Sequence, residues 1–595
     1  AYQVAPLAVP VAHDDEYDTT RLPDGELLDA PLLAPALRLL VDRACRGNPA
    51  FTLTGQNIGA LSAICRRLDG LPLALELAAA RLRLLTPDEL LARLDRQLTL
   101  LTQGARDAPD RQQTLRSALA WSYDLLTPHE QAILRRMAIF AGGATLGAAE
   151  MVCADTASLF TCAGEGDRPD SLTILGALVE QSLLVCDEVD AWHGAGGRRL
   201  RLLETIRDYA WEQLCAMGED DNAQRAHARY FARYADEAEA LPPPQRSARY
   251  RSYGVDLDNF RAALRWASQC ADGADICVGL RLASALGPYW YASGRLSEGQ
   301  RWLDDLLARA NAPGQGEQLC ADAVLGRATD MAGWIAADRG EYARAVPLLQ
   351  RSIMIYRGLD DGAALADALD RLGHATLTLG DADSAQAHFT ESLELRRELD
   401  NPGGIAASLN SLAVVADRRG HLAEAEALLR ECLAIHRRVG EPWGEVFALC
   451  NLAEVACARA AYAEATMLVE EGQAIAQRWG SGTAIAYTLG MRGYISYRQN
   501  DYTQAARWWN ESLTLRREQG DRYSTAFCLL RLAEIARDQA HYADALAYYR
   551  ESLALYHALE VTTSVAECLD GITAVVAQVE QMERNEATLP PPAHS

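Results

Sequence analysis

The feature that most constrains the fold of this chain is an internal repeat in its C-terminal half. Six segments align at a spacing of 40 residues without a slip: "RGEYARAVPLLQRS", "LGDADSAQAHFTES", "RGHLAEAEALLREC", "RAAYAEATMLVEEG", "QNDYTQAARWWNES" and "QAHYADALAYYRES". A fixed period of this length is the signature of stacked supersecondary units. The C-terminal half is therefore expected to form a solenoid rather than one globular core.

Each unit carries small residues at two fixed positions and an apolar residue four positions after the second. The small residues of the first expected helix are Gly333, Gly373, Ala413, Ala453, Gly493 and Ala533. Those of the second are Ala345, Ala385, Ala425, Ala465, Ala505 and Ala545. The apolar residues are Leu349, Phe389, Leu429, Val469, Trp509 and Tyr549. Small residues facing large ones let two helices pack closely, so the pattern predicts a helix pair in each unit.

This pattern resembles the tetratricopeptide repeat, with helices longer than in the usual unit of about 34 residues. An earlier, degenerate unit fits around Gly294, Leu296, Gly299 and Leu303. Such an array forms a superhelix whose inner groove binds other molecules, most often protein segments. The expected partner is a protein or a small-molecule signal.

Four inner-face residues are candidates for the ligand-binding groove: Trp334, Tyr494, Tyr497 and Arg537. Each lies six or three residues before a repeat marker (residues 340, 500 and 540), a position expected on the inner face of the superhelix. The alternative is that these side chains are only solvated or packed between helices.

The composition excludes several classes of function. The 595 residues carry a formal net charge of -24 and give a pI of about 5.0, which opposes non-specific binding to nucleic acid. All 57 Lys and Arg residues are arginine, so the chain has neither a P-loop lysine nor a Schiff-base lysine. It also lacks His-Glu-x-x-His and Gly-x-Ser-x-Gly motifs. An enzyme active site within this chain is not expected.

Cysteine usage and the absence of long apolar runs indicate the compartment. The 14 cysteines include no Cys-x-x-Cys pair, and a chain of this size does not need a disulfide framework, so we expect reduced thiols and no metal site. No segment resembles a secretory leader, and no apolar run reaches the ~18–20 residues of a membrane span. A cytoplasmic protein with no membrane partner is expected.

Residues 108–217 read as helices followed by a β-hairpin. Thr127, Pro128 and Glu130 occupy the cap, first and third positions of a capping box. A helix at about 171–181 precedes the strand-like runs "SLLVCDEV" and "RRLRLLE", which a glycine-rich segment joins. This order indicates a winged helix.

A winged helix often binds DNA, and three arginines on the second strand are candidates for a phosphate-contacting edge. They are Arg198, Arg199 and Arg201. The alternative is an arginine-rich surface or a domain interface.

The stretch "CRRLDGLPLALELAAARL", residues 65–82, reads as a helix interrupted once. Glycine and proline cost roughly 1 and 3 kcal/mol relative to alanine in a helix interior, so Gly70 and Pro72 mark a boundary. One helix is expected to end near Asp69 and another to begin at Pro72, because proline suits the first helical position. Residue chemistry alone indicates a corner between two helices.

The order of this corner, the winged helix and the repeats resembles the C-terminal part of the bacterial STAND signal-transduction ATPases, which are NB-ARC-like. The nearest branch is that of the AfsR-like and LuxR-type regulators, and the resemblance covers about residues 1–580. It implies that Pro72 lies against the adenine of bound ADP or ATP, with Gly70 and Leu71 shaping the turn. It also implies that the Walker A, Walker B and sensor segments precede Ala1. The nucleotide site is then incomplete here, and this chain hydrolyses nothing.

The family's Met-His-Asp motif aligns with Leu202, Leu203 and Glu204. Leucine cannot donate the hydrogen bond of the family histidine, so no nucleotide contact is assigned to Leu203. Either nucleotide is sensed differently in this branch or the resting state is held less tightly.

We therefore predict a mainly α chain. Its expected parts are a small helical domain at 1–100, a winged helix at 108–217, a helical, degenerate repeat region at 224–320, tetratricopeptide repeats at 321–580 and a disordered tail at 581–595.

The predicted function is the signal-sensing segment of a STAND-type nucleotide switch, acting as a transcriptional regulator that forms homo-oligomers on activation. Any effector domain, including one that contacts DNA, lies outside this chain. Two alternatives stay open. One is a protein-binding scaffold without catalytic function, and the other is direct DNA binding by the winged helix.

Overall fold

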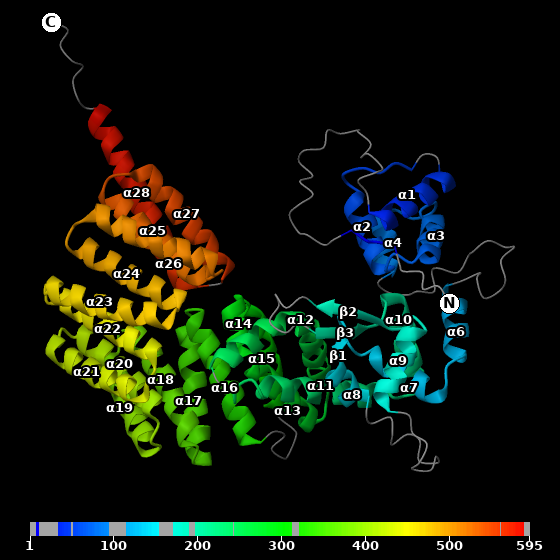
Figure 1. Ribbon diagram of the computed structural model, residues 1–595, viewed down its shortest axis with the longest axis horizontal. Coiled ribbons are helices and arrows are strands. Elements are labelled where there is room, and N and C mark those ends of the chain that lie inside the picture. The colour runs from blue at the N-terminus through cyan, green and yellow to red at the C-terminus, as the bar shows by residue number, and fades with distance from the viewer. Residues whose placement is uncertain are drawn as a thin grey trace, which may run out of the picture. The chain divides into compact units, whose positions relative to one another are not determined.

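The computed structural model describes residues 7–10, 34–48, 51–94, 115–153, 170–189, 197–241, 243–311, 321–559 and 561–587. The chain divides into two compact units, Ala1–Ala267 and Ser268–Ser595. Helices make up most of both units, and the described strands form one small sheet (Figure 1). The predicted mainly α fold class is confirmed.

The first unit begins with four described helices that share one apolar core. They are α1 (Pro35–Gly47), α2 (Ile58–Arg67), α3 (Pro72–Arg81) and α4 (Pro87–Leu94). Three of the four begin at a proline, whose missing amide hydrogen would have no helical partner at that position. The fully buried side chains of this core include Leu40, Leu61, Ile64, Leu75 and Leu90.

The rest of the first unit places helices around a three-stranded antiparallel sheet. The elements are α6 (Leu115–Asp124), α7 (Pro128–Met137), β1 (Ala144–Thr145), α8 (Leu146–Cys153), α9 (Ser171–Glu180), β2 (Val185–Val189), β3 (Gly197–Arg201), α10 (Glu204–Ala216), α11 (Asp220–Asp236) and α12 (Pro243–Ala267). The strand order is β1-β3-β2, and Leu200 on the central strand lies opposite both Ala144 and Cys186.

Several local predictions for this region are confirmed. The capping box is present at α7, where Glu130 N donates to Thr127 Oγ1 at 3.3 Å and Thr127 N donates to Glu130 Oε2 at 2.7 Å. The predicted helix appears as α9, and the predicted hairpin appears as β2 and β3. Strand β1 was not foreseen because two residues are too few for a sequence pattern. The assignment of residues 108–217 to a winged helix stays a prediction.

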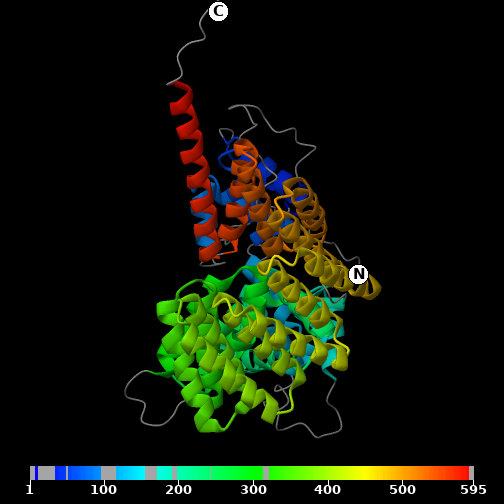
Figure 2. The same ribbon diagram turned by 90° about the vertical axis from the view of Figure 1, so that its left-hand side faces the viewer.

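The second unit is an ordered series of helices. They are α13 (Gly273–Ala285), α14 (Gly287–Ser293), α15 (Leu296–Ala310), α16 (Asp322–Asp338), α17 (Tyr342–Leu359), α18 (Gly362–Thr378), α19 (Ala382–Glu398), α20 (Pro402–Arg418), α21 (Leu422–Val439), α22 (Pro442–Ala458), α23 (Tyr462–Trp479), α24 (Gly482–Arg498), α25 (Tyr502–Glu518), α26 (Arg522–Asp538), α27 (Tyr542–Ala558) and α28 (Thr562–Ala587). Consecutive helices from α16 to α27 stack in chain order, and α28 extends past them (Figure 2).

The 40-residue period is confirmed at the level of helix packing. The second helix of each pair starts at residue 342, 382, 422, 462, 502 or 542. The predicted small residues lie where the paired helices cross: a Cβ at Gly373 would lie 2.5 Å from the ring of Phe389, and one at Gly493 would lie 2.6 Å from the ring of Trp509. Glycine at these positions leaves room for the facing ring.

A serine hydroxyl also joins the two helices of several pairs. Ser392 Oγ donates to Ala366 O at 2.9 Å, Ser512 Oγ to Ala486 O at 2.7 Å and Ser552 Oγ to Ala526 O at 2.8 Å. All three serines are fully buried. Each hydroxyl therefore has a partner inside the helix pair, as buried polar groups require.

The array curves until its last helices contact its first ones. The hydroxyl of Thr562, at the start of α28, donates to the backbone oxygen of Arg339, which follows α16. Close by, the side chain of Leu559 lies against Gly294: a Cβ there would be 2.9 Å from Leu559 Cδ2. The degenerate unit around Gly294 therefore takes part in the contact between the two ends of the array.

Two expectations are corrected. Helix α28 continues through Ala587, so the predicted disordered tail is wrong for residues 581–587, and residues 588–595 lie outside those described. Cys277 takes part in a disulfide bond, so the expectation that every thiol is reduced is wrong at that position. Eleven other described cysteines, including Cys65 and Cys450, form no disulfide bond.

No helix in the described part of the chain combines the length and the apolar character that crossing a bilayer requires.

The helix crossings give a test of stability. Gly373→Ala places a methyl group against the buried ring of Phe389, and we expect a net loss of about 1–2 kcal/mol in the free energy of unfolding despite the better helix propensity of alanine. Gly358→Ala, in the open part of α17, serves as the matched control and should gain up to ~1 kcal/mol. Thermal unfolding of the three proteins checks both signs. Equal effects of the two substitutions would contradict the packing described.

Candidate functional site

The corner between α2 and α3 has a left-handed backbone at two consecutive residues. The φ angle is 51° at Asp69 and 64° at Gly70. Gly70 N donates to Cys65 O at 3.1 Å, which satisfies a carbonyl at the end of α2. Helix α2 ends at Arg67, two residues before the predicted end, and α3 begins at Pro72 as predicted.

Gly70 is needed for close contact as well as for its φ angle. A Cβ at this position would lie 2.1 Å from Leu7 O, and Leu7 N donates to Gly70 O at 3.1 Å. The backbone that approaches Gly70 is therefore the chain's own. Leu71 is half-buried, whereas Pro72 is exposed. Of the three predicted cofactor-binding residues, Pro72 alone offers an exposed side chain to a ligand.

Ion pairs join this corner to the start of α10. Arg67 Nη1 donates to Glu204 Oε2 at 3.3 Å, and Arg67 Nη2 donates to Asp208 Oδ2 at 2.6 Å. The backbone N of Thr205 lies 3.4 Å from Asp69 Oδ2 and donates to it. Two segments about 137 residues apart in sequence are thus held together by three polar contacts.

Asp69 lies in a setting that disfavours its charge. Burial raises the pKa of Asp69 to about 6, the hydrogen bond from Thr205 N opposes this rise, and the nearby charge of Glu204 adds to it. The negative charge of Asp69 is therefore a cost to the folded state at neutral pH.

The segment aligned with the family's Met-His-Asp motif lies at the same place. Leu202 and Leu203 are buried, and Leu203 is the N-cap residue of α10. Glu204 pairs with Arg67 and, through its other oxygen, accepts from Arg207 Nη1 at 3.0 Å. The two leucines thus pack in the core, and the acidic third position makes the contact to the corner.

The arginines of β3 do not form an unpaired basic edge. Arg199 is buried and its Nη2 donates to Asp256 Oδ1 at 2.7 Å and to Gly143 O at 2.9 Å. Arg201 Nε donates to Asp187 Oδ2 at 2.5 Å, and Arg198, which is exposed, lies 3.5 Å from Glu188 Oε1. The alternative interpretation, a domain interface, therefore fits Arg199, whose partner Asp256 lies on α12.

The inner-face candidates separate into two clusters. Tyr497 OH donates to Asp538 Oδ2 at 2.6 Å, and Arg537 pairs with the other oxygen of the same carboxylate at 3.0 Å. Tyr494, one turn from Tyr497 on α24, accepts a hydrogen bond from Arg498 Nη1 at 2.7 Å.

Trp334 belongs to the second cluster. Its ring centroid lies 5.4 Å from that of Tyr291, and the guanidinium of Arg371 lies 5.7 Å from the ring. The structure therefore joins Tyr497 and Arg537 through Asp538, whereas Tyr494 and Trp334 have other partners.

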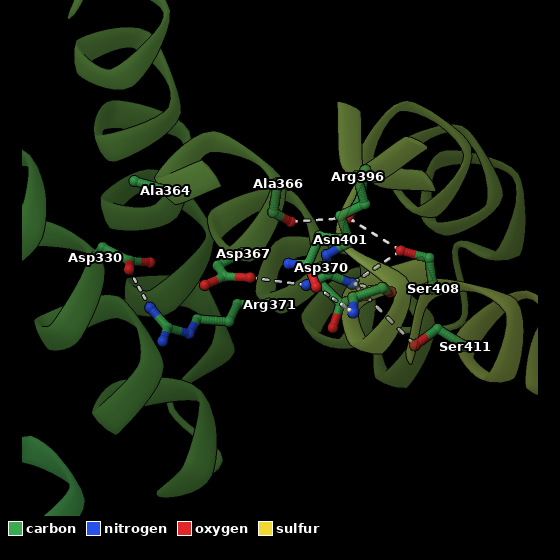
Figure 3. A network of polar contacts seen from close by, with 12 residues as sticks. Asp330, Ala364, Ala366, Asp367, Asp370, Arg371, Arg396, Asn401, Ser408 and Ser411 are labelled. Carbon is green, nitrogen blue, oxygen red and sulfur yellow. Dashed lines mark hydrogen bonds and ion pairs between the residues drawn. The ribbon is translucent and has the colours of Figure 1, made fainter. Parts of the chain in front are cut away.

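Arg371 also belongs to a polar network that connects four helices, α16, α18, α19 and α20. It pairs with the buried carboxylate of Asp330 on α16, as Figure 3 shows. On the neighbouring helices, Arg396 Nη2 donates to Asp367 Oδ1 at 2.8 Å and Arg396 Nη1 donates to Ser408 Oγ at 2.8 Å (Figure 3). Burial raises the pKa of Asp330, and Arg371 opposes this rise. These contacts fix α16, α18, α19 and α20 relative to one another.

Sequence reasoning missed Arg67, Asp69 and the Asp330–Arg371 pair. The sequence held only a weak signal for the partners of Arg67: Glu204 and Asp208 are four residues apart, so both carboxylates lie on one face of a helix. In the described part of the chain, no set of three or more His, Cys, Asp or Glu side chains is placed to hold a metal ion.

Comparison with known families supports the repeat assignment. The family model described as "Tetratricopeptide repeat" matches residues 325–398, 364–438 and 483–558. The array therefore contains tetratricopeptide repeats, as the resemblance implied.

Two curated relatives come from Mycobacterium tuberculosis strain H37Rv. One carries the provisional name HTH-type transcriptional regulator Rv0890c; it is 36% identical over 360 residues, which is 60% of this chain and 38% of that protein. The other, the uncharacterized protein Rv0894, is 38% identical over 186 residues, which is 31% of this chain and 44% of that protein. The matches thus span less than half the length of both relatives.

Among solved structures, the chain was matched to that of a STAND protein with a tetratricopeptide repeat sensor, PH0952 from Pyrococcus horikoshii. The TM-score is 0.49 at 12% sequence identity, over 93% of this chain and 74% of that one.

The setting of Asp69 predicts a pH-dependent stability. Its pKa in the folded state is above its ordinary value, so ionisation destabilises the fold as pH rises from about 4 to about 6. Asp69→Asn removes this cost and keeps both an oxygen for Thr205 N and a residue type that tolerates positive φ. We expect the variant to be more stable than the parent above pH 6, with the difference disappearing below pH 4.

Thermal unfolding midpoints across this pH range measure the difference. Asp400→Asn, at an exposed residue with a φ of 49°, controls for the loss of one carboxylate at a left-handed position. A difference for Asp69→Asn that did not change with pH would show that the carboxyl group is not the cause.

Removing the ion pairs of Arg67 should loosen the backbone at both ends of the contact between the corner and α10. Arg67→Gln removes both ion pairs to α10, so amide hydrogens of residues 68–71 and 203–208 should exchange several-fold faster. Arg43→Gln, which removes the exposed pair with Glu76 between α1 and α3, is the matched control. Hydrogen exchange read by mass spectrometry measures both. Unchanged exchange in residues 203–208 would mean that the ion pairs do not hold the two segments together.

Proposed function

We propose that this chain is the sensing and coupling segment of a STAND-type nucleotide-dependent switch that regulates transcription. The observation that supports it best is the contact between the corner and the start of α10 through Arg67, Glu204 and Asp208. The family resemblance assigns nucleotide-facing roles to these two places separately, and here they lie against each other.

The repeat array supplies the sensing part of the proposal. Tetratricopeptide repeats present extended surfaces to protein segments or other ligands. A ligand shifts a switch only if its affinity differs between the two states. In this proposal the signal bound by the array favours the open state, and homo-oligomerisation follows. The location proposed is the cytoplasm.

The output proposed is transcriptional. A relative at 36% identity carries the provisional name of an HTH-type transcriptional regulator. The paired state of Arg199 and Arg201 argues against DNA contact through β3, so we place DNA binding in a segment outside this chain.

The cofactor proposed is ADP or ATP, bound with residues that this chain does not contain. The exposed ring of Pro72 fits an adenine contact, because a rigid apolar face can lie against a base. Gly70 does not fit a direct contact because Leu7 covers it. In the proposed site Gly70 and Leu71 therefore hold the turn, and Pro72 faces the base. This chain alone is expected to bind nucleotide weakly and to hydrolyse none.

The test uses calorimetry with ADP and ATP on a protein extended upstream through the proposed ATPase core. Pro72→Ala should weaken nucleotide binding about tenfold. Pro87→Ala, at the first position of α4 in the same group of helices, is the matched control and should leave it unchanged. The isolated chain should bind at least a hundredfold more weakly than the extended protein.

No binding by the extended protein would overturn the switch and leave the second candidate, a tetratricopeptide scaffold. That candidate is favoured by the polar network among α16, α18, α19 and α20, which connects these helices without any nucleotide. Equal binding by the Pro72 and Pro87 variants would remove Pro72 from the site.

A further inference from the structure

A cavity of about 450 Å³ lies within the second unit, where the last helices of the array meet its first ones. Its wall includes Tyr291 of α14, Asp338 at the end of α16 and Tyr342 of α17 from the first helices. Asp521 and Tyr523, at the start of α26, and Leu559 and Val561, near the ends of α27 and α28, complete it. The volume is in the range of small-ligand sites.

Asp338 is the unusual group in this wall. It is half-buried, and no described residue bonds to its carboxylate; burial is the sole cause that raises its pKa, to about 6. The equivalent position five repeats later is Asp538, whose two oxygens pair with Tyr497 and Arg537. The same position of the repeat therefore has partners in one place and faces the cavity without them in the other. At neutral pH Asp338 is mostly ionised.

Two tyrosine rings stand beside this carboxylate. Tyr291 is 47% exposed and Tyr523 is 45% exposed. The Asp338 charge acts on both: burial raises the pKa of Tyr291 to about 12 and raises the pKa of Tyr523, and Asp338 adds to each rise. Aromatic faces attract cations, and a carboxylate in the same cavity strengthens the attraction.

The other charged groups of the wall have different settings. Asp521 pairs with Arg516 Nη1 at 3.2 Å and caps α26 by accepting from Ser524 N at 3.0 Å. Arg522 is exposed to solvent. Asp338 is therefore the carboxylate of the cavity that is left for a ligand.

We propose that this cavity binds a positively charged ammonium or guanidinium group, with Asp338 as its counter-ion and the rings of Tyr291 and Tyr523 beside it. This inference names the chemistry of a ligand of the repeat array. Its role in sensing rests on the proposed function. The wall combines the first and the last helices of the array, so a bound cation stabilises the contact between the two ends of the array. A free amine and a basic side chain of a protein segment share this chemistry.

Calorimetry on the full chain without nucleotide tests the proposal. The probes are putrescine, for a free amine, and N-acetyl-argininamide, for an arginine side chain of a protein. N-acetyl-citrullinamide, which has the same shape without the charge, is the neutral comparison. We expect one of the two cations to bind saturably and at least tenfold more tightly than the citrulline compound.

Asp338→Asn, which keeps the shape of the side chain, should lower the affinity at least tenfold, and Tyr523→Leu should lower it several-fold. Asp544→Asn, at an exposed carboxylate of α27, removes the same charge elsewhere and should leave the affinity unchanged. This control is needed because a chain of net charge -24 attracts any cation weakly.

A tighter putrescine complex identifies a free amine as the ligand type, and a tighter argininamide complex identifies a basic protein segment. Failure of both cations to bind, equal binding of the citrulline compound or equal losses in the Asp338 and Asp544 variants would overturn the proposal. None of these results involves nucleotide, so each is distinguishable from failure of the proposed switch.

Discussion

The close crossing of two helices within each repeat is the constraint on which the second unit depends. A glycine or alanine on one helix faces a leucine, valine or aromatic side chain on the other, and at the glycines the contact leaves no room even for a Cβ atom. Repeating this contact every 40 residues fixes the path of the array. The polar contacts of the array, from the buried serines to the Asp330–Arg371 pair, are formed between helices that this packing has already brought together.

Sequence analysis succeeded where one local rule decided the outcome. The repeats, the capping box at Thr127 and the start of α3 at Pro72 all follow from spacing or from the chemistry of single residues. The partners of Arg67 could not be predicted, because they depend on how α2 and α10 meet in space. Asp338 and Asp538 illustrate the same limit: they share a repeat position, yet neighbours at the ends of the array give them different surroundings.

Because the chain has no lysine, every buried cationic side chain that joins two of its elements is an arginine or a histidine. A guanidinium keeps its charge when buried and can bond to two acceptors at once, whereas an ammonium group loses its proton more readily. Arg199, Arg396 and Arg516 are all buried and each bonds to a carboxylate. Arginine therefore acts in this chain as a fixed connector between elements, at the helix-to-sheet contact of the first unit and between the repeats of the second.

The contact between the two ends of the array has a consequence for its evolution. An open solenoid can gain or lose a repeat and keep every remaining interface, because each unit touches only its neighbours. Here Thr562 reaches Arg339 and Leu559 reaches Gly294 only because the intervening pairs turn the chain through the required angle. Inserting or deleting one repeat would rotate these ends away from each other. The contact between the ends thus ties the geometry of the array to its number of repeats, as closure ties a barrel to its number of strands.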